Sequence, residues 1–211
     1  MRTIRVIGRG AATAPADGVE LTFTVCRICE NTENAVAETD KRAAQLRAGI
    51  VAVGFSEEDL KTTNFTVSAE YENEHVNGAY SRKFKGYACR EGFKLAFPYE
   101  SKRLAEAVSA LTAGGAEEEF AVTFTVQDQD ALKSEAVKNA FAEAKRRAEA
   151  LAEASGERLG NIAEMSCNAK GNLREGTHVA ETAAMALRSM PHIEPEDIRG
   201  TAEVEVVWEL A

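Results

Sequence analysis

The last strand-like segment constrains the fold more than any other part of the chain. Between Thr201 and Leu210 the sequence reads TAEVEVVWEL, in which apolar and acidic residues alternate. Successive side chains of a β-strand point to opposite faces, so this pattern predicts a strand with one buried and one solvated face. The face expected to be buried carries Val204, Val206, Trp208 and Leu210. We also expect this strand to be internal to its sheet, because the large Trp208 indole needs a deep site.

Other segments alternate in a similar way and are bounded by residues typical of turns. We therefore expect strands at Thr3–Gly8, Glu20–Cys29, Lys61–Tyr71, Arg82–Phe97, Glu118–Val126, Leu159–Cys167 and Thr201–Leu210. The expected loops are Ala12–Gly18 and Glu72–Ala79, and the segment Asn168–Arg199 is expected to be irregular.

Three segments repeat apolar residues at steps of three and four, which is the spacing of one helical face. The first face carries Val36, Thr39, Ala43, Leu46, Ile50 and Val53. The second carries Leu104, Val108 and Leu111. The third, in a helix from about Asp130 to Ser155, carries Val137, Phe141, Ala144, Ala148 and Leu151. Glycine is common just after a helix, so Gly54, Gly114-Gly115 and Gly156 mark the three expected ends.

These elements predict an α+β protein, with an antiparallel or mixed sheet covered by helices on one face. Thr22-Phe23-Thr24-Val25 recurs as Thr123-Phe124-Thr125-Val126, and each copy leads into a helix that ends at a glycine. The repetition indicates two duplicated β-α-β units that lie side by side. We therefore expect one continuous sheet and a single domain over residues 1–211.

The net charge limits the classes of partner that this chain can be expected to bind. The formal net charge is −9, whereas nucleic acids and anionic membranes attract basic surfaces, so we expect neither partner. No apolar run approaches the ~20 residues that span a bilayer, so we expect no membrane insertion. No apolar stretch near the start is typical of a leader. We expect a cytoplasmic protein, or a periplasmic or extracellular one whose leader was removed in cloning.

Two groups of residues are candidates for a metal or redox site. Cys26 and Cys29 have CxxC spacing, but they end a strand, where positions three apart point to opposite faces. Glu72, Glu74 and His75 lie in a polar stretch with one histidine, whereas zinc sites favour several nitrogen or sulfur ligands. We therefore expect no metal, no cofactor and no catalytic residue, and hence no enzyme.

Several short motifs resemble the SIMPL domain family, a bacterial domain of unknown function. The segments that carry the resemblance are DLKTTNFTVSAEYE, GYACREGFKLAF and IEPEDIRGTAEVEVVWEL. The matching motif residues are Gly8-Arg9-Gly10, Pro15-Ala16-Asp17, Thr63-Asn64-Phe65 with Tyr71, and Ile193-Glu194-Pro195. The resemblance covers nearly the whole chain and implies a fold rather than an activity. It also implies a relationship to periplasmic and outer-membrane-associated antigens that assemble into large rings and are linked to stress responses.

The segment Gly176–Pro195 is the predicted oligomer interface. It is too long for a simple connection and too apolar for a free linker. Its apolar side chains would share a face of a short helix or adapt to an irregular surface. The candidate interface residues are Val179, Ala183, Met185, Leu187 and Met190. The alternative is that this segment folds back over its own sheet.

The expected function lies in a homo-oligomer. We expect a non-enzymatic scaffold or an interaction surface for an unidentified protein partner, linked to stress. The alternative is a binding module that holds a small ligand or peptide between the sheet and the segment Asn168–Arg199.

Overall fold

The computed structural model describes residues 2–76, 79–113, 120–168, 176–179 and 194–211. It divides the chain into two compact units, each built on its own sheet. Unit 1 comprises Met1–Asp17, Phe124–Gly176 and Pro195–Ala211. Unit 2 comprises Gly18–Thr123 and Thr177–Glu194.

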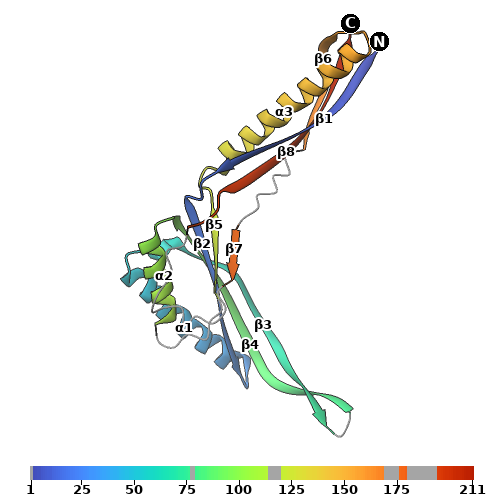
Figure 1. Cartoon of the computed structure of the whole chain (residues 1–211). Coiled ribbons are helices and arrows are strands. Elements are labelled where there is room, and N and C mark those ends of the chain that lie inside the picture. Colours follow the sequence, from blue (N-terminus) through green and yellow to red (C-terminus); the bar gives the residue numbers. More distant parts are fainter. Residues whose placement is uncertain (1, 77–78, 114–119, 169–175, 180–193) are drawn as a thin grey trace. The chain divides into compact units, whose positions relative to one another are not determined.

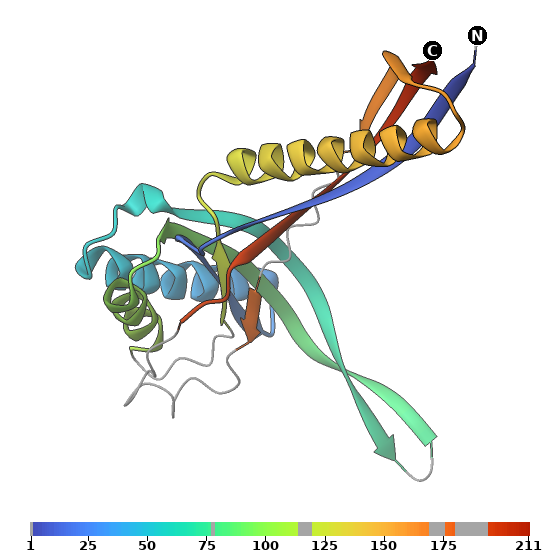
Figure 2. The same cartoon turned by 45° about the horizontal axis from the view of Figure 1, so that its top comes forward.

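Unit 1 is a three-stranded antiparallel sheet with one long helix on it. Its elements are β1 (Thr3–Ala14), α3 (Gln129–Ala154), β6 (Leu159–Asn168) and β8 (Ile198–Leu210). The strand order is β1-β8-β6, so β8 is central and the other two strands are edges. Helix α3 runs along one face of this sheet (Figures 1 and 2). The start of β1 and the end of β8 lie side by side, because Thr3 pairs with Glu209.

The core of unit 1 lies between the sheet and α3. Val6, Val204 and Val206 are buried there, and Trp208 is only 3% exposed. The ring centroid of Trp208 lies 6.4 Å from that of Phe141 on α3. The predictions of an internal last strand and of a deep site for Trp208 are therefore confirmed.

The buried face of α3 differs from the predicted one. The residues that α3 buries are Leu132, Ala136, Ala140, Ala144, Ala148 and Ala152. Val137 and Phe141 lie beside this line of alanines, and Leu151 is 53% exposed. The prediction was wrong for Leu151, whereas Val137 and Phe141 pack against the margin of the core. Alanines occupy its centre because the helix lies so close to the sheet that a larger side chain is disfavoured.

Unit 2 is built on a five-stranded sheet with two helices. Its elements are β2 (Gly18–Cys29), α1 (Thr32–Ala52), a 3-10 turn η1 (Glu57–Asp59), β3 (Leu60–Val76), β4 (Ala79–Pro98), α2 (Ser101–Thr112), β5 (Phe120–Thr125) and β7 (Gly176–Val179). The strand order is β3-β4-β2-β5-β7, so β3 is an edge strand.

The core of unit 2 lies between this sheet and α1. The rings of Phe23 on β2 and Phe93 on β4 stack with centroids 5.1 Å apart. The guanidinium of Arg47 on α1 lies 5.1 Å from the centre of the Phe93 ring. Five residues of α1 are buried: Ala35, Thr39, Ala43, Leu46 and Ile50. Ala35 thus replaces the predicted Val36 at the first buried position.

The structure confirms the α+β class and corrects the prediction of a single sheet. The repeated segments lie on β2 and β5, which are neighbours in the five-stranded sheet. The strand after the second helix, β6, lies in the three-stranded sheet instead, so the two β-α-β units do not form one continuous sheet. The helix ends are confirmed at Gly54 and Gly156, which have positive φ angles of 92° and 78°. The assignment of residues 1–211 to a single domain stays a prediction.

Two predicted loops are largely strand. β1 continues through Ala14, and the hairpin of β3 and β4 leaves only residues 77–78 between its strands. No helix lies over either face of the end of this hairpin in Figures 1 and 2, and residues 71–73 and 82–85 are exposed. Alternation marks a strand only where one face is buried, which explains why the sequence pattern indicated a loop there.

Candidate functional site

The Gly8-Arg9-Gly10 motif brings α3 unusually close to β1. A Cβ atom on Gly8 would lie 2.1 Å from Ala140 O, and one on Gly10 would lie 2.1 Å from Ala140 N. Both distances are too short for any real side chain, so the motif is required by close packing of helix on strand. The two glycines therefore serve backbone packing in unit 1, where glycine in a strand marks the close approach of another backbone.

Side chains of α3 also satisfy the outer backbone groups of β1. An edge strand exposes unpaired N–H and C=O groups that can pair with another chain. Three polar residues at steps of four on α3 bond to these groups. The bonds are Asn139 Nδ2 to Ala11 O at 2.9 Å, Arg9 N–H to Glu143 Oε2 at 2.6 Å, and Arg147 Nη1 to Ile7 O at 3.2 Å. We call β1 the capped edge.

The sequence carries a signal for this cap. Asn139, Glu143 and Arg147 are spaced like one helical row, directly beside the row of buried alanines. Glu143 and Arg147 also form an ion pair at 2.6 Å, which holds both side chains over β1. Polar residues that flank a line of small residues therefore indicate a helix that reaches over a strand edge.

The opposite edge, β6, lies beside an apolar groove. The groove has a volume of about 400 Å³ and is lined by Val137, Lys138, Phe141, Ile162, Met165, Cys167 and Val204. Ile162 is exposed, and Met165 is 59% exposed. Since α3 is drawn toward the glycines of β1, it leaves the β6 side of this sheet face uncovered. We call β6 the open edge.

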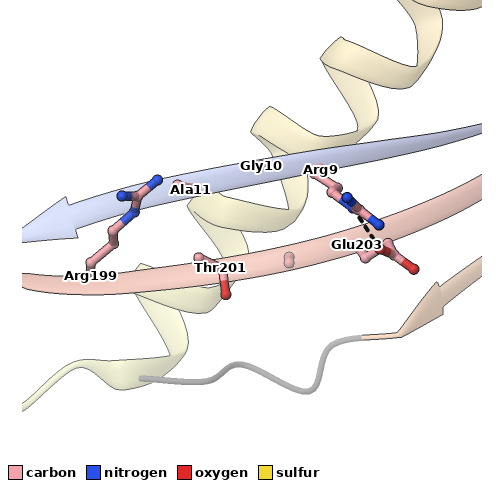
Figure 3. A pocket seen from close by; sticks show the side chains of 7 residues that line it. Arg9, Gly10, Ala11, Arg199, Thr201 and Glu203 are labelled. Atoms are coloured by element: carbon pink, nitrogen blue, oxygen red, sulfur yellow. Dashed lines mark hydrogen bonds and ion pairs between the residues drawn. The ribbon is translucent and has the colours of Figure 1, made fainter. Parts of the chain in front are cut away.

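The other face of the unit 1 sheet carries a polar hollow (Figure 3). It has a volume of about 510 Å³, and its side chains come from β1 and β8. Arg9 Nε donates to Glu203 Oε2 at 2.9 Å, which neutralises both groups. Arg199 extends beside Thr201 and Ala11 and has no ion-pair partner in the described part of the chain. A single exposed guanidinium attracts anions, but it provides neither a nucleophile nor a base for catalysis.

Unit 2 carries an exposed apolar strip on its β3–β4 hairpin. The strip consists of Phe65, Val67, Tyr71 and Phe84, all of which are exposed. The Tyr71 and Phe84 rings meet edge to face with centroids 5.6 Å apart, and Phe84 also contacts Tyr87 at 5.3 Å. β2 pairs with β4 only as far as Tyr87, so Tyr71 and Phe84 lie on a two-stranded extension.

An ion pair joins β3 and β4 on the face of the unit 2 sheet that lies opposite α1. Arg90 on β4 donates to Glu70 and to Ser68 Oγ, both on β3. The hydrogen bond to Glu70 raises the pKa of the Arg90 guanidinium above its ordinary value, against the opposing effect of desolvation. This ion pair fixes the two strands together, and its Arg90 guanidinium stays protonated at any pH where proteins fold.

The candidate metal and redox residues do not converge. Cys26 and Cys29 are both free thiols, and their positions along β2 point to opposite faces. Glu72 pairs with Lys83 in the hairpin, while the side chains of Glu74 and His75 lie outside the described residues. Within the described ranges, no three His, Cys, Asp or Glu residues form a group that could hold a metal ion.

The predicted oligomer interface lies almost wholly outside the described residues. Ala183, Met185, Leu187 and Met190 fall in residues 180–193, and only the backbone of Val179 is described, at the end of β7. The interface stays a prediction. In the part of the chain that the structure covers, no helix combines the length and the hydropathy needed to cross a bilayer.

Other motif residues are also structural. Asp17 Oδ1 accepts the Gln127 backbone N–H at 2.7 Å, and Gln127 Nε2 donates to Asp17 O at 2.9 Å. These bonds fix the turn after β1 to the start of the connection into α3. Asn64 follows a β-bulge in β3, and its Oδ1 occupies the space that the missing Cβ of Gly92 leaves free.

Comparison with known proteins identifies the family of this chain. No curated protein matches the chain. Residues 4–208 match the SIMPL family, which is described as a protein of unknown function (DUF541). The match includes the glycines of β1, the turn at Asp17 and the central strand β8. The chain therefore belongs to the SIMPL family.

Proposed function

We propose that this SIMPL protein is a non-enzymatic, self-assembling protein whose role lies in the oligomer. The oligomer would act as a scaffold, or as a surface offered to a protein partner in a stress-linked process. The observation that carries the proposal is the exposed apolar strip of Phe65, Val67, Tyr71 and Phe84 on the hairpin of unit 2.

Exposure of the strip to water is unfavourable for an isolated chain. Phe65 is 54% exposed on an edge strand, although a neighbouring helix lies over the same sheet. On α1, Arg47 Nη2 donates to Thr62 Oγ1 at 3.1 Å, close to the start of β3, and the strip lies further along. Contiguous apolar patches of this kind mark protein contacts more often than they mark free surface. A two-stranded ribbon is also only marginally stable in water, so a partner would stabilise it.

The proposal predicts that the strip sets the mass of the protein in solution. We expect the wild type to be an oligomer by light scattering. The double variant Phe65→Gln/Phe84→Gln should have a lower mass, because it removes two rings from the contact. The matched control is Val51→Gln, which changes an exposed apolar residue on α1 of the same unit. A monomeric wild type, or a double variant with the wild-type mass, would refute the proposal.

A second candidate function is a binding module for a small ligand or peptide. The apolar groove beside β6 is the feature that favours it. Native mass spectrometry of the purified protein separates the two functions. A bound molecule in one-to-one ratio with the chain would favour the binding module, whereas multiples of the bare chain mass would favour self-assembly.

A further inference from the structure

We propose that the open edge β6 is a contact between two copies of this chain. In this contact β6 pairs antiparallel with β6 of a second copy, about a two-fold axis at Ser166. The three-stranded sheets of the two copies then join across the axis. The inference concerns a different surface from the strip of unit 2, and it rests on the proposed function in that both need an oligomer.

Backbone hydrogen bonds show which groups of β6 face outward. Leu210 N–H donates to Arg2 O, on the β1 side of β8, whereas Ala211 and Arg158 exchange both backbone bonds on the β6 side. The backbone N–H and C=O groups of the even-numbered residues of β8 thus point toward β1, and those of the odd-numbered residues point toward β6. Because Ser166 pairs with Glu205, its backbone groups point inward. The backbone groups of Met165 and Cys167 therefore point away from β8, at the open edge.

The two edges of this sheet differ in whether their outward backbone groups have hydrogen-bond partners among the described residues. On β1, the outward groups of Ile7, Arg9 and Ala11 are bonded to side chains of α3. On β6, the described residues provide no strand and no side-chain cap for the outward groups of Met165 and Cys167. Unpaired edges recruit further strands unless they are blocked. The unblocked edge is thus the one open to β-strand addition.

The side chains at the open edge also favour the addition of a strand from a second copy. Ile162, Met165 and Cys167 line the groove beside α3 and are exposed to solvent. In strand addition, backbone bonds supply affinity while side chains fill the adjoining pockets. A two-fold axis at Ser166 places Met165 of one copy across from Cys167 of the other. Each copy then covers the groove of its partner with the same apolar residues that its own groove exposes.

Charge favours a second copy over a charged partner. Only one of the residues 159–168 is charged, in a chain with a net charge of −9. That residue, Glu164, lies 3.7 Å from Arg5 on the sheet face opposite the groove. The groove itself has one charged residue, Lys138, which lies 3.3 Å from Glu135. Two copies can therefore meet at β6 without like-charge repulsion, and an acidic or basic peptide finds no complementary row of charges.

A charge placed on each edge tests the inference. Met165→Lys puts an ammonium group at the open edge, and Ile7→Lys puts the same group on the capped edge, where Ile7 is 42% exposed. We expect light scattering to show that Met165→Lys halves the mass of the assembly and that Ile7→Lys leaves it unchanged. Equal masses for wild type and Met165→Lys would overturn the inference, as would a wild type that is already monomeric.

Disulfide trapping tests the register. In a Cys167→Ser background, Ser166→Cys places one thiol at the two-fold axis, and Thr13→Cys places one on the capped edge as the control. We expect mild oxidation to give covalent dimers of the first variant only. Dimers of neither variant, or of both equally, would overturn the pairing. If the assembly breaks with the strip variants and not with Met165→Lys, the proposed function stands while this inference fails.

Discussion

The two edges of the unit 1 sheet have the same neighbour, β8, and the same helix above them, yet only one is protected. On β1 the helix side chains Asn139, Glu143 and Arg147 bond to the outward backbone groups. On β6 the helix leaves an apolar groove. The cause lies in Gly8 and Gly10, which let α3 approach β1 closely. The absence of a side chain at two positions of β1 therefore decides which edge of this sheet is blocked.

The largest effect is expected from the core that both edges share. Trp208→Ala removes the largest side chain beneath α3, so the free energy of unfolding should fall by ~3–5 kcal/mol. Urea denaturation measures this loss, and native tryptophan emission should be blue-shifted because Trp208 is buried. Leu151→Ala, an exposed change on the same helix, should stay within about 0.5 kcal/mol of wild type. Emission typical of a water-exposed indole would contradict the packing.

The next largest effect is expected from a substitution that prevents the close approach of α3 to β1. Gly8→Ala places a methyl group against the α3 backbone, so we expect a loss of about 3 kcal/mol in the free energy of unfolding. The matched control is Gly49→Ala in α1, where the new Cβ would lie 3.4 Å from its nearest neighbour, Ala110 O. That change should stabilise the protein by up to ~1 kcal/mol, because alanine is the better helix former. A harmless Gly8→Ala would show that α3 does not need its close approach.

A smaller effect is expected when one of the three side chains that bond to the backbone of β1 is removed. Glu143→Ala leaves the Arg9 N–H without its carboxylate partner and should cost about 1 kcal/mol of unfolding free energy. Glu149→Ala removes a carboxylate whose nearest cation is Lys145 at 3.9 Å, so its cost should be much smaller. Thermal or urea unfolding of both variants measures the difference. Equal losses would mean that the bond from Arg9 to Glu143 does not contribute to the stability of the capped edge.

The sequence predicted the existence of the elements better than their contacts. The predicted face of α3 included Ala144 and Ala148 but centred on the large residues Val137, Phe141 and Leu151, because a hydrophobic stripe is identified by its largest members. The structure buries a row of alanines instead, since the partner strand carries glycines at the contact. Reading Gly8 and Gly10 together with the alanine spacing of α3 would have indicated the closer packing.

The partner of each strand could not be predicted from alternation. β5 has the inward and outward pattern of any half-buried strand, and nothing in that pattern states which sheet it joins. The prediction of one sheet followed from the similarity of Thr22–Val25 to Thr123–Val126, which concerns local structure only. The candidate sites show the same limit. The open edge becomes visible only once the position of α3 across the sheet is known.

Hydrogen exchange at two amides tests most directly whether α3 caps one edge and leaves the other to a second copy. The amides are those of Arg9, bonded to Glu143, and Cys167, which faces outward from β6. We predict that both are protected in the wild type. In Met165→Lys, Arg9 should keep its protection while Cys167 loses it. A Cys167 amide that exchanges freely in the wild type, or an Arg9 amide that loses protection in the variant, would contradict this account of the two edges.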